Sequence, residues 1–206
     1  MNENISIRTF IAIELPEEVK NGLLNLESRL KTSNPSAAKW VEPGSIHLTL
    51  KFLGETRLDL IPTFTSALDN ISKSSPPFTL AVTELGAFPD IRHVQVIWVG
   101  LTGALSELNR LQKNIEDAIS PLGYPTEKRT FVPHLTLARM RDSASLQDRQ
   151  NLGALLARTS INSSLNLKAD SVNLIQSRLT PGGAIHTNLH SAKLSPSPSL
   201  LRLASF

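Results

Sequence analysis

The sequence predicts a protein in which β-strands and helices alternate in two rough halves. One four-residue run, His-Leu-Thr-Leu, occurs at 47–50 and again at 134–137, and each copy stands in a stretch with the alternating apolar pattern of a strand. Runs with apolar residues at helical spacing, such as 103–119, separate the strands. The 206 residues suit one domain or two closely packed lobes and are enough to bury a real core.

The first half begins with a strand that alternates cleanly between two faces. Pro16 and the two glutamates after it start the following helix, because proline is tolerated in the first turn and acids suit the positive end of the helix dipole. A turn at Pro43 and Gly44 precedes the first motif strand. The elements expected here are a strand at 5–15, a helix at 16–31, an extended segment at 38–41, a strand at 46–53 and a helix at 58–71.

The second half is richer in strands, and β-branched residues are frequent in 94–99. A Ser-Pro-rich segment closes the chain, and we expect the tail over 195–206 to be disordered. The elements expected before it are strands at 78–85 and 93–99, a helix at 103–119, a strand at 132–140, a helix at 146–158, and strands at 164–169, 171–179 and 184–194, with a turn at 180–183 between the last two.

Composition excludes several classes of protein. There is no cysteine, so disulfides and zinc sites with thiolate ligands are ruled out. No apolar run approaches the roughly 18 residues of a membrane span, and the polar N-terminus is unlike a secretory signal. We therefore expect a cytoplasmic protein with no membrane partner. A net charge of +3 and a pI near 9.4 permit an RNA or phosphate partner without arguing for a broad nucleic-acid surface.

Strand geometry predicts which side chains of the first motif share a face. Side chains alternate along a strand, so His47 and Thr49 point to one side and the two leucines point to the core. The same alternation places Lys51 beside the histidine and sends Phe52 to the core.

The second motif repeats this arrangement with His134 and Thr136. If the two strands face each other, two imidazoles and two hydroxyls surround one small anionic group, which suits acid/base chemistry at a phosphate. Alternation puts Arg139 on the leucine face, so it reaches the cleft only if the strand twists or ends near Ala138.

The two motifs in their long contexts resemble those of the 2H phosphoesterase superfamily, and within it the RNA 2',3'-cyclic phosphodiesterase family, also described as 2'-5' RNA ligase-like or LigT-like. The resemblance runs from Arg8 to about Leu194. It rests on Phe10–Ala12, His47–Gly54, Gly86–Pro89, Phe131–Arg139 and Ser177–Gly183.

This resemblance implies an α+β fold: a single bilobal domain over 1–194, with two antiparallel sheets facing across a central cleft and helices outside. It also implies hydrolysis of an RNA 3'-terminal 2',3'-cyclic phosphate to a 2'-phosphate. By match to the motifs, His47 is the proton donor and His134 the proton acceptor, and Arg139 contacts the phosphate.

The residue types suit this reaction. An imidazole has a pKa near 6.5, so its neutral and charged forms are both accessible around neutral pH. A neutral histidine accepts the proton of the attacking water, and a protonated one gives a proton to the leaving ribose oxygen. The hydroxyls of Thr49 and Thr136 are placed to hydrogen-bond the non-bridging phosphate oxygens, and a guanidinium such as that of Arg139 suits a phosphate.

Three further residues are candidates for substrate contacts. Phe10 lies on the non-core face of the first strand, where an exposed aromatic stacks on a base or packs between the lobes. Arg129 and Phe131 stand just before the second motif. We expect the remaining histidines to be surface or structural residues, including His186, which stands where the family often has tyrosine.

Several alternatives stay open from the sequence. The same acid/base pair serves 2'-5' RNA ligation or hydrolysis of small cyclic or 2'-5'-linked nucleotides. A non-enzymatic alternative is a module that only binds RNA or nucleotides, although such a module needs no proton-transfer pair. A histidine metal site lacks the acidic or thiolate partners that usually support one. We expect RNA 3' ends or small cyclic nucleotides as substrates, no metal or other cofactor, no obligate protein partner and a monomer.

Overall fold

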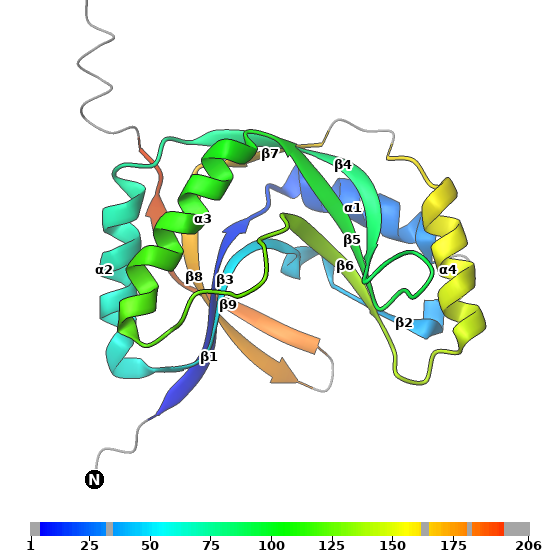
Figure 1. Cartoon of the computed structure of the whole chain (residues 1–206), viewed down its shortest axis with the longest axis horizontal. Helices are drawn as coiled ribbons and strands as arrows, with labels where there is room; N and C mark the ends of the chain where they lie inside the picture. The colour runs from blue at the N-terminus through cyan, green and yellow to red at the C-terminus, as the bar shows by residue number, and fades with distance from the viewer. Residues whose placement is uncertain (1–4, 32–34, 162–164, 181–182, 196–206) are drawn as a thin grey trace, which may run out of the picture.

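The protein contains two antiparallel β-sheets that face one another across the middle of the molecule (Figure 1). The computed structural model describes residues 5–31, 35–161, 165–180 and 183–195. The first sheet has the order β3 (His47–Arg57), β1 (Ser6–Glu14), β8 (Ser171–Thr180) and β9 (Gly183–Lys193). The second sheet has the order β2 (Ala38–Trp40), β6 (His134–Met140), β5 (Val96–Gly103), β4 (Phe78–Phe88) and β7 (Asn166–Ala169).

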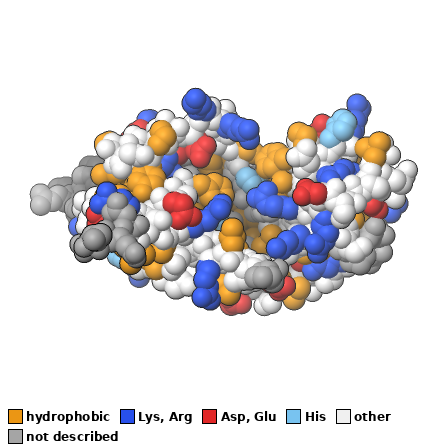
Figure 2. All heavy atoms as spheres, turned by 90° about the horizontal axis from the view of Figure 1, so that it is seen from below, with side chains coloured by type: hydrophobic (Ala, Val, Ile, Leu, Met, Phe, Trp, Pro, Cys, Tyr) orange, Lys and Arg blue, Asp and Glu red, His pale blue; other side chains and the backbone are white. Residues whose placement is uncertain are grey.

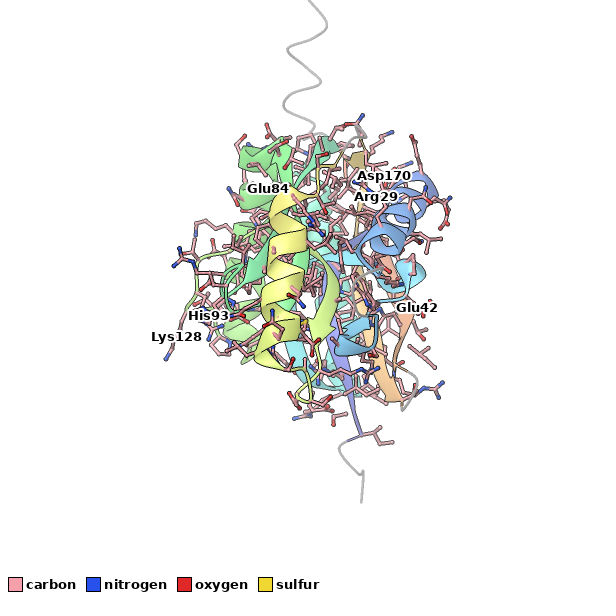
Figure 3. The ribbon with its side chains drawn as sticks, turned by 90° about the vertical axis from the view of Figure 1, so that its right-hand side faces the viewer. Arg29, Glu42, Glu84, His93, Lys128 and Asp170 are labelled. Carbon is pink, nitrogen blue, oxygen red and sulfur yellow. The ribbon has the colours of Figure 1, made fainter. Side chains whose placement is uncertain are left out.

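The helices cover the outer sides of the sheets, so the inner faces stay open to one another. α2 and α3 pack on the first sheet, and α4 packs on β4 of the second sheet with α1 beside it (Figures 1 and 3). Their bounds are α1 (Glu17–Leu30), α2 (Ile61–Ser72), α3 (Leu105–Ile119) and α4 (Leu146–Arg158). Short 3₁₀ turns lie at η1 (Pro35–Ala37), η2 (Pro43–Ser45), η3 (Leu58–Leu60) and η4 (Ser120–Leu122).

One continuous hydrophobic core joins the helices to both sheets. The leucines of the two motifs belong to it and are almost fully buried, as alternation predicts; they are Leu48, Leu50, Leu135 and Leu137. A second, smaller cluster of Phe10, Ala12 and Ile175 lies on the opposite face of the first sheet. The motif strands thus carry the main core on one face and the cleft on the other.

A one-residue β-bulge interrupts the alternation of β3. Ala12 of β1 pairs with Thr49, and the next residue, Ile11, pairs with Lys51, so Leu50 is the extra residue. A bulge of this kind reverses the faces of the side chains that follow it, here Lys51 and Phe52, until a second register shift between Phe52 and Gly54. The predictions for Lys51 and Phe52 are therefore wrong: Lys51 is buried among core residues, and Phe52 is 57% exposed.

The second motif strand contains the same bulge at the equivalent position. Trp98 of β5 pairs with Thr136, and Ile97 pairs with Ala138, so Leu137 is the extra residue. The first seven residues of β3 and of β6 consequently show the same order of half-buried, buried and exposed side chains. Arg139 lies on the same face as the histidine and threonine, which simple alternation did not predict.

The buried lysine is neutralised by a distant acid. Lys51 Nζ donates to Glu116 Oε2 on α3 at 2.6 Å and to the carbonyl oxygen of Pro125 at 2.9 Å. The side chains of the pair are only 1% and 9% exposed. A buried charge needs this kind of partner, because desolvation without one is very costly. The ion pair thus fixes β3 to α3 at the bulge.

The order of elements agrees with the sequence analysis, and α4 begins and ends where apolar spacing predicts. The predicted helix at 58–71 is a 3₁₀ turn followed by α2. Of the predicted tail, Ser195 donates its backbone N–H to Ser72, and 196–206 lie outside the described residues, as do 181–182 of the predicted turn. Among the described helices, none is long and apolar enough to cross a membrane.

The buried pair makes a testable prediction about stability. Lys51→Met leaves the Glu116 carboxylate buried without its cation, and we expect a loss of about 3–5 kcal/mol in the free energy of unfolding. The double variant Lys51→Met/Glu116→Leu removes both charges and should recover most of that loss. Urea denaturation of the two variants measures the difference. A double variant as unstable as the single one would contradict this account of the pair.

Candidate active site

The two motif histidines are held in the same way at the start of their strands. The Nδ1–H group of His47 donates to the carbonyl oxygen of Ser45 at 2.8 Å, and that of His134 donates to the carbonyl oxygen of Val132 at 2.7 Å. In each case the acceptor lies two residues earlier in the chain. Since a carbonyl only accepts, this bond selects the tautomer and leaves Nε2 of each neutral ring as the acceptor.

The two histidines belong to different sheets, and their strands β3 and β6 contact one another. Figure 2 shows the hollow between the two parts of the molecule, with a histidine side chain inside it. Thr49 and Thr136 share the face of their respective histidines and are half-buried. Within the described part of the chain neither hydroxyl has a hydrogen-bond partner, so both are available to a ligand.

Aromatic rings enclose His47 on the first sheet. Phe10 stacks on the imidazole with ring centroids 4.4 Å apart, and His186 of β9 meets both rings edge-on at 5.1 Å. Phe10 is only 3% exposed. The expectation of an exposed aromatic at this position is therefore wrong, because the ring forms the wall behind His47.

Different aromatic residues surround His134 on the second sheet. Phe88 at the end of β4 meets its ring edge-on at 5.0 Å, and Trp98 lies 6.4 Å away. The indole of Trp98 lies across Gly86, where an added Cβ would be 2.2 Å from the ring. Gly86 thus leaves the space that Trp98 needs beside the histidine. This explains two residues of the Gly86–Pro89 segment.

Burial gives His47 a different pKa from that of an ordinary histidine. Desolvation lowers the pKa of His47 to about 4, the bond to the Ser45 carbonyl opposes this shift, and the nearby His186 adds to it. Burial also lowers the pKa of His186. In the free protein at neutral pH, His47 is therefore neutral and its Nε2 carries a lone pair.

The bulges place two different side chains at equivalent positions, five residues after each histidine. These are Phe52 on the first sheet and Arg139 on the second, and both are exposed. No acid forms a salt bridge with Arg139 among the described residues. Phe52 is a cleft residue that the alternating pattern does not predict, because such a pattern does not show where a bulge lies.

The remaining candidates lie farther from the centre of the site. Arg129 is exposed in the segment before β6, and the partly buried Phe131 packs against the main core. His190 bonds Asp69 of α2 on the helix side of the first sheet, at 2.7 Å. His186 differs from the expectation of a surface or structural residue, because it contacts His47 directly. Among the described residues, no three His, Asp or Glu side chains gather closely enough to hold a metal ion.

The model of the LigT-like phosphoesterase family matches the chain twice, over residues 13–98 and 99–186. The chain belongs to this family. The resemblance seen in the sequence is thus confirmed, and this phosphoesterase is an enzyme by family. Each match contains one copy of the motif, which agrees with the common burial pattern and the common bulge of the two strands.

Named relatives are similar over most of their length. The RNA 2',3'-cyclic phosphodiesterase of Methanothermobacter thermautotrophicus is 26% identical over 190 residues, which cover 92% of this chain and 100% of the relative. The protein of the same name from Aquifex aeolicus is 35% identical over 154 residues, covering 72% of this chain and 78% of the relative.

Solved structures confirm the predicted fold. A protein of Thermus thermophilus superposes with a TM-score of 0.77 at 25% identity, over 92% of this chain and 99% of that one. E. coli LigT, solved in complex with 3'-AMP, gives a TM-score of 0.75 at 23% identity, over 93% and 99% of the two chains. The arrangement of two facing sheets with outer helices is therefore that of LigT-like structures.

The enclosure of His47 makes a prediction about its titration. Burial disfavours the charged ring, so the imidazole should stay neutral as the pH falls through 6.5 and take up its proton only near pH 4. Inorganic phosphate bound in the cleft should raise this pKa, because an anion stabilises the imidazolium. His186→Gln should also raise it, because the His186 imidazole lowers the pKa of His47. NMR titration of the ring carbons measures all three; a His47 that titrates near 6.5 without ligand contradicts the account.

Proposed function

We propose that this enzyme hydrolyses the 2',3'-cyclic phosphate at the 3' end of an RNA and leaves a 2'-phosphate. The observation that carries the proposal is the pair of motif strands on facing sheets, each holding a histidine by the same Nδ1 bond with Nε2 left for proton transfer. The names of the relatives support the same reaction.

In the proposed reaction, His134 is the proton acceptor and His47 the proton donor. Water attacks phosphorus in line with the leaving O3' while Nε2 of His134 takes its proton. The new P–O bond forms as the P–O3' bond breaks, and Nε2 of His47 gives its proton to O3'. The two rings then exchange protons with solvent and return to their starting states. Facing strands suit this step because donor and acceptor must lie on opposite sides of phosphorus.

The phosphate is held by three groups from the same two strands. The hydroxyls of Thr49 and Thr136 donate to the non-bridging oxygens, and the guanidinium of Arg139 offers paired N–H donors and a charge that is fixed at any working pH. These contacts strengthen as negative charge builds up on the oxygens in the transition state, so they lower the barrier as well as bind the substrate.

If His47 is the proton donor, substrate binding must change its protonation state. The ring is neutral in the free protein, with a pKa of about 4. The anionic cyclic phosphate opposes the desolvation that lowers this pKa, because an opposite charge nearby favours the charged ring. His47 therefore acquires its proton in the complex, next to the oxygen that needs it.

The proposed reaction needs no metal ion or other cofactor, since the two imidazoles move the protons and Arg139 and the threonines stabilise the charge. A monomeric, cytoplasmic enzyme stays our prediction. Ligation of RNA ends through a 2'-5' bond would use the same cyclic phosphate and the same pair of histidines.

Hydrolysis of a short RNA with a 2',3'-cyclic phosphate, assayed in EDTA, tests the proposal. We expect turnover in the wild type and a loss of about 10²- to 10⁴-fold in kcat for His47→Ala and for His134→Ala, the range for a general acid or base. His190→Gln is the matched control, because that histidine lies on the helix side of the first sheet. Turnover that disappears in EDTA and returns with a divalent metal would falsify the metal-free mechanism, and RNA binding without turnover would favour a binding module.

A second test concerns the phosphate contact of Arg139. Arg139→Gln removes a charged hydrogen bond, which is worth about 1.5–3 kcal/mol, so kcat/KM should fall by roughly 10- to 150-fold. Arg139→Lys keeps the charge without the paired donors, so its kcat/KM should lie between those of the wild type and the glutamine variant. Steady-state kinetics on the same RNA measure these values; a glutamine variant with wild-type kcat/KM would remove Arg139 from the site.

A further inference from the structure

A basic surface surrounds Arg139, at the other end of β6 from His134. Lys39 of β2 pairs directly with Arg139 of β6, so the two cations lie side by side on the cleft face of the second sheet. Two open cavities of about 520 and 460 Å³ adjoin this point, and they share Arg139, Met140 and Asp142 in their walls. We call the surface formed by Lys39, Arg139, Arg141, Asp142 and Arg149 the basic track.

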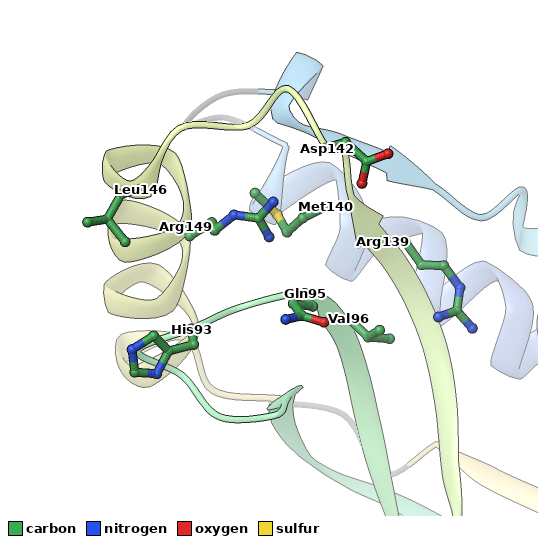
Figure 4. A pocket seen from close by; sticks show the side chains of 8 residues that line it. All are labelled: His93, Gln95, Val96, Arg139, Met140, Asp142, Leu146 and Arg149. Atoms are coloured by element: carbon green, nitrogen blue, oxygen red, sulfur yellow. The ribbon is translucent and has the colours of Figure 1, made fainter.

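The larger cavity extends the track toward α4. Its walls come from the loop before β5, the start of β5, the end of β6 and α4 (Figure 4). Arg149 is fixed there, because its guanidinium donates to the carbonyl oxygens of Val94 at 2.7 Å and Arg141 at 3.1 Å. Gln95 adds an exposed amide to the same cavity. The track is therefore a shaped surface with at least one anchored cation.

The charge of the track is strongly one-sided. It contains four cationic side chains and a single acid, Asp142, which lines both cavities. Lys39, Arg139 and Arg141 are exposed, and none of them forms a salt bridge within the described ranges. Figure 2 shows Lys and Arg side chains gathered on one side of the hollow. The chain as a whole has a net charge of only +3, so this local concentration is distinctive.

We propose that the basic track binds the RNA strand on the 5' side of the terminal cyclic phosphate. This inference rests on the proposed function, in which Arg139 contacts the reacting phosphate. From that point the only additional anions of the substrate are the phosphates of the preceding nucleotides, one for each residue of the strand. Cations in a groove that continues from the reacting phosphate match such a series of charges. A mononucleotide has no phosphate to place there.

The track therefore makes the enzyme selective for chain length. An RNA oligonucleotide gains contacts that a nucleoside 2',3'-cyclic phosphate lacks, and this gain should weaken as salt rises, because phosphate contacts release counterions. Lys39 and Arg141 do not contact the reacting atoms. They therefore affect how tightly the RNA strand binds, and this produces the selectivity for chain length.

The test compares kcat/KM for an oligonucleotide with a terminal cyclic phosphate and for the mononucleotide. Lys39→Gln and Arg141→Gln should each lower the oligonucleotide value by about two- to five-fold, the effect of one exposed charge contact, and leave the mononucleotide value unchanged. Asp142→Asn should raise the oligonucleotide value. The matched control is Lys168→Gln, an exposed lysine on β7 at the opposite edge of the same sheet.

Direct binding separates this inference from the proposed reaction. Fluorescence anisotropy with a labelled RNA ending in a 3'-hydroxyl needs no turnover, and the dependence of log K on log salt should become shallower by about 0.7 for each cation removed. Loss of binding in the track variants supports the track even if no hydrolysis is found. Equal effects on oligonucleotide and mononucleotide, or no effect on either, would overturn it.

Discussion

One extra residue directly after the His-Leu-Thr run of each motif decides which of the next side chains reach the cleft. The bulges at Leu50 and Leu137 shift the pairing by one, so the residues after them exchange faces. On β6 this brings Arg139 onto the same face as the histidine and threonine. On β3 it buries Lys51, whose charge is then neutralised by Glu116. The site and the core of this enzyme thus depend on the same irregularity.

The two halves share a backbone arrangement but give their histidines different surroundings. Both rings donate Nδ1–H to the carbonyl two residues earlier. His47 is enclosed by Phe10 and His186, which removes it from water and lowers its pKa. His134 instead meets Phe88 edge-on. A repeated strand therefore supplies two imidazoles held by the same backbone bond, one of which is enclosed by aromatic rings.

Local sequence patterns predict the order of helices and strands, because apolar spacing and proline act over a few residues. They also predict the face shared by His47 and Thr49, which precede the bulge. These patterns fail just after the bulge, because an alternating apolar pattern does not show where an extra residue lies in the strand. The partner of Lys51 is 65 residues away in the sequence, and the enclosure of His47 by His186 depends on pairing between distant strands. The position of Arg139 came from family resemblance rather than from alternation.

The position of the phosphate in the product tests the central assignment most directly. His47 as donor to O3' and His134 as acceptor from water together require that the P–O3' bond breaks. We therefore expect ³¹P NMR of the hydrolysed RNA to show a 2'-phosphate. A 3'-phosphate would mean that O2' leaves instead, and it would contradict the roles given to the two histidines.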